Sequence, residues 1–341
     1  MNHLTFLIGV SVGALVLIQT ASAQLVEEER LAEYQKRNYT WPMAKVFPDT
    51  EGWTRRMDRR MAQVERVADN DLRYNGWMAV MASAIAMPSF TESGWGLTRA
   101  PTDVMKELME SLHNGLPTAQ EESYINVIQG GERPLFVHQP KLNQKVLDDL
   151  KPMHEEWAGV ELEGSLSYGL RVYRNNSRLF MHVDKLRTHV ISCILHVDHS
   201  EDSEPWPILI EDFQGNTNEV VLESGDLLFY ESSKCIHGRP KPLNGSWYSS
   251  LFVHYRPVGW EMDKAELETH YAIPSHWHTA KPLDPSVDEL VMVGTSMTEP
   301  NCPYEWCGTN DTVKWRGPAI EGKVISTGFQ YPDASNKGDE L

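Results

Sequence analysis

The spacing of hydrophobic and polar positions changes character near residue 160. Before that point, apolar residues recur three or four positions apart in three stretches, 52–70, 102–117 and 140–159. This spacing is typical of amphipathic helices, and we predict a helix in each stretch. Thr102 or Asp103 can cap the second helix. The region 24–160 is therefore predicted to be mainly helical.

One segment of this region, 76–90, has an apolar run without clear periodicity. The run is about a dozen residues long, whereas a membrane-spanning helix needs about 20. We therefore predict a buried helix or strand here rather than a membrane span.

From residue 164 onward the pattern shifts to short runs rich in β-branched and aromatic residues. Clusters of Gly, Asn, Asp, Ser and Pro separate these runs, as expected for strands joined by turns. Several short strands at this spacing predict a β-sandwich or barrel. The fold class is thus α+β. The predicted strand regions are 165–174, 188–197, 205–213, 218–232 and 246–257.

Composition narrows the range of partners. The chain has 341 residues, 41% of them hydrophobic and 23% charged, which is typical of a globular protein, and its formal net charge is −17. An excess of negative charge argues against nucleic acid or an anionic membrane as the main partner. The length accommodates one large domain or two of ordinary size.

Both ends of the chain resemble targeting signals. An apolar run from Leu4 to Ile18 is followed by Ala21-Ser22-Ala23, which predicts a signal peptide over residues 1–23. If it is not cleaved, the same run would act as a membrane anchor. The last four residues, Gly338 to Leu341, resemble an endoplasmic-reticulum retrieval signal. We therefore expect the protein in the lumen of the endoplasmic reticulum, or secreted if the tail is not recognised.

The four cysteines fit an oxidising compartment without requiring it. Cys302 and Cys307 could close a small loop, whereas Cys193 and Cys235 are either inert core thiols or a pair. N-glycosylation sequons also suit a secretory protein. They begin at Asn38, Asn175, Asn244 and Asn310.

The candidate chemistry lies in a His-x-Asp pattern that occurs twice, at His182/Asp184 and at His196/Asp198. On a strand, residues two apart point to the same face, so either pair could hold a metal from one side. A third ligand, His237, follows the turn at Gly225-Asp226 and a predicted strand. Two imidazoles and one carboxylate form the facial triad of non-haem iron(II) oxygenases, which leaves coordination positions open.

Residues 165–257 resemble the catalytic domain of the 2-oxoglutarate- and iron(II)-dependent dioxygenases, particularly the prolyl 4-hydroxylase branch. The similarity is carried by "LRVYRNNSRLFMHVD" and "GDLLFYESSKCIHGRPKPLNG". It implies a double-stranded β-helix (jelly roll) with helices packed outside. It also favours His182, Asp184 and His237 as the iron ligands over His196 and Asp198, because the family's motif precedes the long apolar strand.

The same resemblance implies Fe²⁺, 2-oxoglutarate and O₂ as cofactors and co-substrates, with ascorbate as a further candidate. Prolyl hydroxylases have a lysine ten positions after the distal histidine that binds 2-oxoglutarate, but this chain has Trp247 there. A buried dicarboxylate needs a cation. We therefore expect Arg239 to bind the distal carboxylate, helped by Tyr173. Arg187 and Lys241 are alternatives.

The sequence therefore predicts four regions: a signal peptide at 1–23, a helical region at 24–160, a dioxygenase core at 161–258 and a Pro- and Trp-rich extension at 259–341. The expected function is hydroxylation of a protein or peptide side chain of the secretory pathway, most simply at proline. Two alternatives remain open, a small-molecule hydroxylase and a non-catalytic jelly-roll binding module. The substrate and the oligomeric state are not encoded in any motif.

Overall fold

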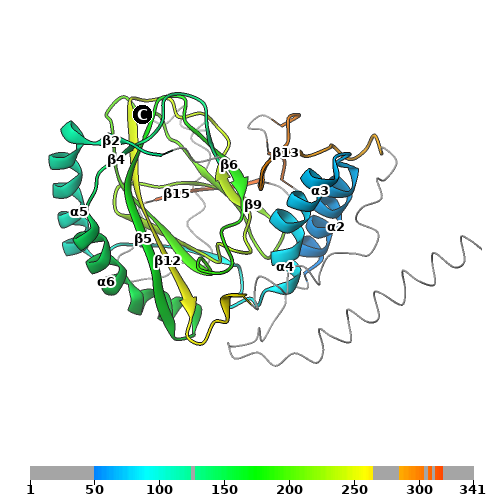
Figure 1. Cartoon of the computed structure of the whole chain (residues 1–341), viewed down its shortest axis with the longest axis horizontal. Helices are drawn as coiled ribbons and strands as arrows, with labels where there is room; N and C mark the ends of the chain where they lie inside the picture. The colour runs from blue at the N-terminus through cyan, green and yellow to red at the C-terminus, as the bar shows by residue number, and fades with distance from the viewer. Residues whose placement is uncertain (1–49, 124–126, 264–283, 303–305, 309–311, 318–341) are drawn as a thin grey trace, which may run out of the picture.

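The computed structural model describes residues 50–123, 127–263, 284–302, 306–308 and 312–317. Two β-sheets face each other and form the centre of the molecule (Figure 1). The larger, seven-stranded sheet has the order β1-β10-β7-β12-β5-β4-β2. Its strands are β1 (Trp95–Arg99), β2 (Gln120–Glu121), β4 (Leu135–Phe136), β5 (Leu162–Arg174), β7 (Ile191–His199), β10 (Asp226–Tyr230) and β12 (Trp247–Pro257).

The second sheet has eight strands, in the order β13-β14-β6-β11-β8-β9-β15, with β3 paired to β6. All pairs in both sheets are antiparallel except β15 with β9. The strands of the eight-stranded sheet are β3 (Ile128–Gln129), β6 (Arg178–His182), β8 (Ile208–Glu211), β9 (Thr217–Val221), β11 (His237–Arg239), β13 (Val291–Val293), β14 (Ser296–Thr298) and β15 (Thr312–Arg316).

The chain passes repeatedly from one sheet to the other between residues 162 and 257. Strands β5, β7, β10 and β12 lie in the seven-stranded sheet, and β6, β8, β9 and β11 lie in the other. This alternation is the arrangement of a jelly roll, in which antiparallel strands form two facing sheets. The expectation of a mixed α+β chain with two antiparallel sheets is confirmed.

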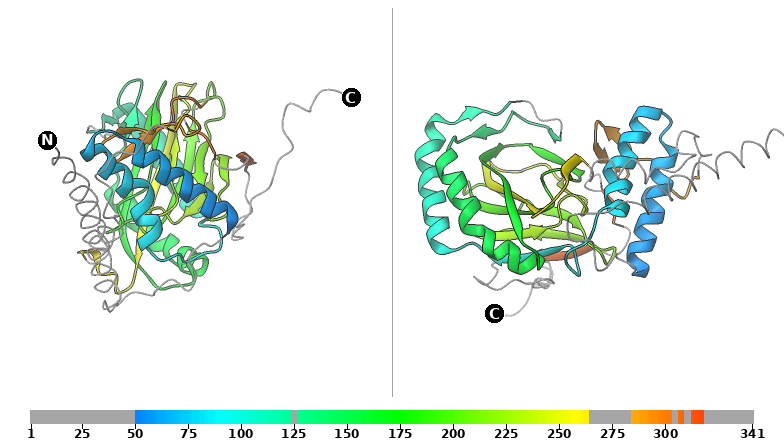
Figure 2. Two further views of the ribbon diagram at one scale, coloured as in Figure 1. Left: turned by 90° about the vertical axis from the view of Figure 1, so that its right-hand side faces the viewer. Right: turned by 60° about the horizontal axis from the view of Figure 1, so that its bottom comes forward.

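Helices cover the outer faces of both sheets (Figures 1 and 2). On the seven-stranded sheet, apolar side chains of α5 and α6 share a cluster with β5, β7, β10 and β12. On the other sheet, side chains of α2, α3 and η1 pack with residues of β6, β8, β13 and β14. The helices are α2 (Glu51–Arg66), α3 (Asn70–Trp77), η1 (Met78–Ala82), α4 (Ser83–Ala86), α5 (Thr102–Gly115), η2 (Leu116–Thr118) and α6 (Pro140–Ala158).

Helix α6 illustrates how local sequence sets an element. Pro140 opens the helix, where a missing N–H costs nothing, and Gly159 ends it with a φ of 68°. Its buried residues recur three or four positions apart, as the sequence predicted. The expected cap of α5 is wrong, because Pro101 is its N-cap and no side chain there accepts a hydrogen bond. The segment 76–90 contains η1 and α4, in agreement with a buried helix.

The regions that flank the predicted core also contribute strands to the two sheets. Strands β1, β2 and β4, which precede residue 160, extend the seven-stranded sheet, and β13, β14 and β15 extend the other. The region before residue 160, predicted to be mainly helical, therefore contains short strands as well as helices. Residues 1–23 and 338–341, for which targeting signals were predicted, lie outside the described residues. Among the residues that the structure describes, no helix has the length and apolar character needed to cross a membrane.

A buried ion network joins the N-terminal helix α2 to the C-terminal segment. Arg60 donates to Glu211 on β8, at 2.6 Å, and to Glu299, which follows β14. All three side chains are fully buried. Cys302 and Cys307 form a disulfide, and the backbone N–H of Cys307 donates to Glu299 at 3.0 Å. The other two cysteines are free and buried. The structure thus decides the pairing, which the sequence had left open.

Candidate metal centre

Two histidines face each other across adjacent strands of the eight-stranded sheet. His182 ends β6, His237 begins β11, and they are direct partners in the antiparallel register. Each ring has its Nδ1 next to a backbone carbonyl two residues earlier, at 2.7 Å from Phe180 O and 2.9 Å from Cys235 O. A carbonyl only accepts, so both Nδ1 atoms carry a proton, and Nε2 is the ring nitrogen left to bind a metal.

Asp184 completes the group. Its Oδ1 lies 3.6 Å from His182 Nε2 and 3.9 Å from His237 Nε2, and one donor atom from each of the three residues falls within 4.8 Å of the others. Its backbone N–H donates to Ser232 O at 2.8 Å, which fixes the chain just beyond β6. Three donors thus converge from one strand, the residue beyond it and a neighbouring strand.

The environment favours the protonation states that a metal requires. Burial alone would raise the pKa of Asp184, but its hydrogen bond with His182 and the nearby His237 and His254 hold that pKa well below its usual range. Burial, followed by the proximity of His182, lowers the pKa of His237 to about 4. Asp184 is therefore held as a carboxylate and His237 as a neutral imidazole near neutral pH, the forms that coordinate a divalent metal.

A further layer of polar side chains supports Asp184 from the seven-stranded sheet. His254 on β12 has its Nδ1 3.9 Å from Asp184 Oδ2 and 2.8 Å from Ser192 Oγ. Ser192 is bonded in turn to Ser232, and His254 stacks on His189 with ring centroids 3.8 Å apart. Sequence reasoning missed these residues. The signals were the position of His254 in the predicted strand 246–257 and of His189 and Ser192 in the predicted strand 188–197, but the pairing of these strands could not be read from the sequence.

The second His-x-Asp pair lies elsewhere. His196 is fully buried inside the sandwich and stacks on Tyr248 at 4.0 Å, with its Nδ1 3.0 Å from Ser249 O. Asp198 lies near the surface, with His113 Nε2 2.8 Å away. The structure does not bring either residue to His237, because His196 and Asp198 belong to the far part of β7.

Arg239 is buried in the same sandwich, with 2% of its surface exposed. Its guanidinium lies 4.6 Å from the ring of Trp206 and 4.7 Å from that of Tyr248. It donates to Trp206 O and, at 3.3 Å, to Tyr248 Oη. Among the described residues it forms no ion pair with a carboxylate, which leaves a buried positive charge without an anion.

Tyr173 also lies inside the sandwich, with 1% of its surface exposed and its ring 5.0 Å from that of Trp206. The other expected anchors, Arg187 and Lys241, are less buried. Arg187 is exposed and pairs with Asp263 at 2.7 Å, and Lys241 is partly exposed. Trp247, at the position of the family lysine, packs against the outer cluster under α5 and α6. Tyr248, the next residue, is the one that faces inward.

Comparisons with known proteins found similar solved structures but no matching family. No family model and no curated protein matches the chain. Solved structures of 2-oxoglutarate–Fe(II) oxygenases, including prolyl 4-hydroxylases, are similar to it. A Pseudomonas putida prolyl-4-hydroxylase is 16% identical, with a TM-score of 0.36 over 49% of this chain and 94% of that chain.

Two further similar structures have different ligands. HygX from Streptomyces hygroscopicus, with nickel, 2-oxoglutarate and hygromycin B bound, is 11% identical, with a TM-score of 0.37 over 50% of this chain and 86% of that one. A Trichoplax adhaerens prolyl hydroxylase in complex with a hypoxia inducible factor peptide fragment is 12% identical, with a TM-score of 0.38 over 62% and 94%. Because these TM-scores lie below 0.5, the function has to be argued from the residues of this chain.

Proposed function

We propose that this protein is an iron(II)- and 2-oxoglutarate-dependent dioxygenase. The observation that carries the proposal is the convergence of His182 Nε2, His237 Nε2 and an Asp184 oxygen inside a jelly roll. Within the described residues, the ligand group contains these three and no fourth. A structural zinc site closes with four ligands, whereas two histidines and one carboxylate leave positions for a co-substrate and dioxygen.

The donor set fits the ion chemically. Imidazole nitrogen suits iron, and the backbone carbonyls at Phe180 and Cys235 fix the tautomer of each ring. When bound, iron would supply the redox chemistry that couples oxidative decarboxylation of 2-oxoglutarate to hydroxylation of a C–H bond. The chain itself holds the ligands in place, keeps Asp184 ionised and shields the centre within the sandwich.

We propose that Arg239 binds the distal carboxylate of 2-oxoglutarate, because its buried charge has no carboxylate partner among the described residues. A buried charge is costly unless an opposite charge offsets it. Arg239 has only neutral partners, Trp206 O and Tyr248 Oη, among the described residues. A carboxylate would supply the missing anion in a geometry that suits a guanidinium fork. Tyr173 is the inward-facing hydroxyl that would assist from β5.

The direct test is turnover of 2-oxoglutarate. Purified protein loaded with Fe²⁺ under nitrogen and then exposed to oxygen should convert 2-oxoglutarate to succinate, measured by mass spectrometry, with and without ascorbate. An H182A variant that remains folded should release none. Equal succinate release from the wild type and H182A would contradict the proposal. No release from either would favour the non-catalytic binding module.

For the substrate we propose a protein or peptide side chain, with proline as the first candidate. Support comes from the resemblance of residues 165–257 to prolyl hydroxylases, and the similar structures include one with a bound peptide fragment. The alternative is a small molecule, as HygX with hygromycin B illustrates for a similar fold. Proline-rich peptides and small metabolites should be compared as stimulants of succinate release. Stimulation by metabolites alone would replace the peptide proposal.

We also propose that the protein works in the lumen of the endoplasmic reticulum. The disulfide between Cys302 and Cys307 supports an oxidising compartment, and Asn175 and Asn244 of two sequons are exposed. Deletion of residues 338–341 should send the protein into the medium of secreting cells. Retention of the shortened protein in membranes would point to an anchor at residues 4–18 instead.

A further inference from the structure

A second guanidinium inside the sandwich already has a carboxylate. Arg171 on β5 donates through Nε and Nη2 to the two oxygens of Glu122, at 2.7 and 2.8 Å. The Tyr168 hydroxyl donates to the same carboxylate, and Arg171 Nη1 lies 3.3 Å from Tyr173 Oη. Both charged residues are buried, with 9% of Arg171 and 4% of Glu122 exposed.

The guanidinium of Arg171 also lies among aromatic rings. Its central carbon is 5.2 Å from the ring centre of Tyr168, 5.6 Å from that of Tyr173 and 5.1 Å from that of Phe252. The two parallel N–H···O bonds have the geometry with which arginine recognises a carboxylate ligand. The guanidinium, the Tyr168 hydroxyl and the surrounding rings together form a binding site for one carboxylate group.

Glu122 comes from a short edge segment. It directly follows β2, the last strand of the seven-stranded sheet, which has two exposed residues and pairs only with β4. One backbone bond, from Glu122 N to Pro134 O at 2.8 Å, continues that pairing. Few backbone bonds would break if Glu122 withdrew, so its carboxylate is held mainly by Arg171 and Tyr168.

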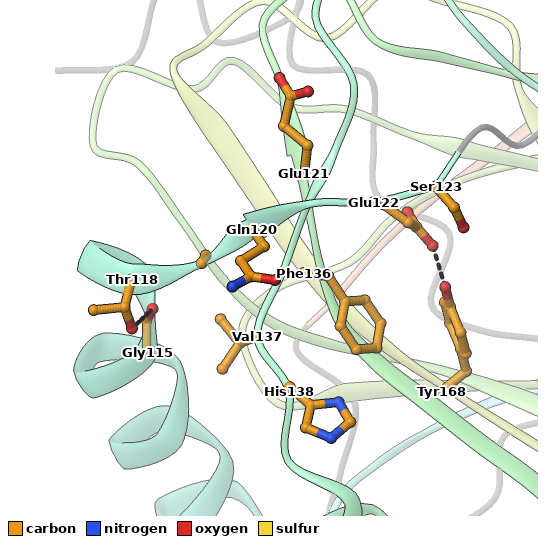
Figure 3. A pocket seen from close by; sticks show the side chains of 11 residues that line it. Gly115, Thr118, Gln120, Glu121, Glu122, Ser123, Phe136, Val137, His138 and Tyr168 are labelled. Carbon is orange, nitrogen blue, oxygen red and sulfur yellow. Dashed lines mark hydrogen bonds between the residues drawn. The ribbon is translucent and has the colours of Figure 1, made fainter.

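The outer side of this ion pair borders a pocket of about 510 Å³. Figure 3 shows Glu122 and Tyr168 facing each other at one wall, with Phe136 beside Tyr168. The rings of Phe136 and Tyr168 are 4.9 Å apart. A ligand in this pocket would therefore reach the Glu122 carboxylate directly.

The inner side of the Arg171–Glu122 ion pair lies toward the candidate metal centre. In the register of β5 with β12, Tyr168 is the partner of Phe252, and Leu166 is the partner of His254. Phe252 and His254 are two residues apart and point to the same face. His254 lies 3.9 Å from Asp184. The Arg171 site is therefore placed between the pocket and the candidate iron ligands.

We propose that Arg171 and Tyr168 form a second carboxylate-binding site, that Glu122 fills it as an internal carboxylate, and that a carboxylate group of the substrate displaces Glu122. The assignment to the substrate rests on the proposed dioxygenase function, whereas the carboxylate site itself does not. A buried ion pair adds little stability over an apolar pair of the same volume. Stability alone therefore does not explain the Arg171–Glu122 pair, whereas a binding site with a displaceable carboxylate does.

The test uses propionate, a monocarboxylate, titrated calorimetrically into metal-loaded protein saturated with 2-oxoglutarate. E122Q keeps the shape and the amide oxygen for Tyr168 but removes the negative charge, so propionate should bind at least about tenfold more tightly than to the wild type. The double variant E122Q/R171Q should lose this gain. E121Q is the matched control, because Glu121 is the neighbouring residue, pairs with Arg174 at 2.8 Å and is exposed.

Equal propionate affinity in E122Q, E121Q and the wild type would overturn the proposal, as would a gain that survives in E122Q/R171Q. If E122Q does not fold, E122D weakens the same contact by one methylene and should shift affinity in the same direction. The number of 2-oxoglutarate molecules bound per chain shows whether the site takes a carboxylate of the substrate or of a second 2-oxoglutarate. One molecule per chain in E122Q supports the substrate, whereas two would assign the site to a second co-substrate molecule and overturn the substrate assignment. Failure of the wild type to bind 2-oxoglutarate would count against the proposed function and leave the propionate result interpretable.

Discussion

His182 and His237 are direct cross-strand partners, with ring centroids 4.5 Å apart and each Nδ1 bonded to the carbonyl two residues earlier in its own segment. The same local hydrogen bond thus orients both rings, although 54 intervening positions separate them in the chain. Because both rings present Nε2 toward Asp184, the site is organised by backbone atoms before any metal binds.

The first prediction concerns metal binding. D184N should weaken Fe²⁺ or Co²⁺ binding on the order of 100-fold or more, because a neutral amide replaces the only anionic ligand. Competition with a chromophoric chelator measures the affinity, and circular dichroism checks the fold. The matched control is D198N, which neutralises the aspartate of the other His-x-Asp pair. Equal affinities of the two variants would contradict the assignment.

The second prediction concerns the co-substrate anchor. R239Q should weaken 2-oxoglutarate binding to the metal-loaded protein by about 2 kcal/mol or more, because a charge-assisted bidentate contact is lost. R239K keeps the charge without the fork and should fall between R239Q and the wild type. R187Q, at an exposed arginine, should bind normally. An unchanged dissociation constant for R239Q would move the anchor away from Arg239.

The third prediction concerns acid stability. Burial lowers the pKa of His154 from 6.5 to about 3. The ring packs against Phe229 and Tyr255, and its Nδ1 lies 2.7 Å from Leu150 O. Below pH 6.5 the unfolded chain binds a proton that the folded chain does not. This residue therefore makes the folded state less stable as pH falls, by up to about 1.4 kcal/mol per unit.

Urea unfolding of the wild type and H154L at pH 7, 6 and 5 tests this effect. The difference in free energy of unfolding should shift in favour of H154L as pH falls, because leucine binds no proton. The exposed Leu166 provides the control variant L166A, which removes no titrating group, so its difference from the wild type should not change with pH. A pH-independent difference for H154L would contradict the linkage.

The fourth prediction concerns the buried ion network. E299Q removes the carboxylate that accepts from Arg60, Arg59 and the Cys307 N–H. It should lower the free energy of unfolding by about 3 to 5 kcal/mol, because a buried guanidinium then lacks part of its counter-charge. E51Q, at an exposed residue of α2 that pairs with Arg55, should change it by less than about 1 kcal/mol. Similar values for both variants would show that the network contributes nothing beyond surface charge.

Local sequence was sufficient for the elements and for one part of the site. Periods of 3.6 and 2 are properties of single segments, so helices α2, α5 and α6 and most strands of the core could be predicted within a few residues. The short strands β6 and β11 lay outside the predicted strand regions. The spacing in His182-x-Asp184 likewise places two donors on one side of a strand end without reference to the rest of the chain. The predicted N-cap of α5 was wrong because several residues near position 102 can precede a helix, and local sequence does not decide among them.

Only the tertiary structure decided the relationships that depend on strand pairing. The register of β6 with β11 sets His237 opposite His182, and the packing of β12 puts Trp247 on its outer face and Tyr248 on its inner face. The contrast between Arg171, paired with Glu122, and Arg239, without a carboxylate partner in the described residues, also arises from residues far apart in sequence. Hydrogen bonding between strands fixes such contacts, and a shift of one residue would reverse every side chain, so no local pattern encodes them.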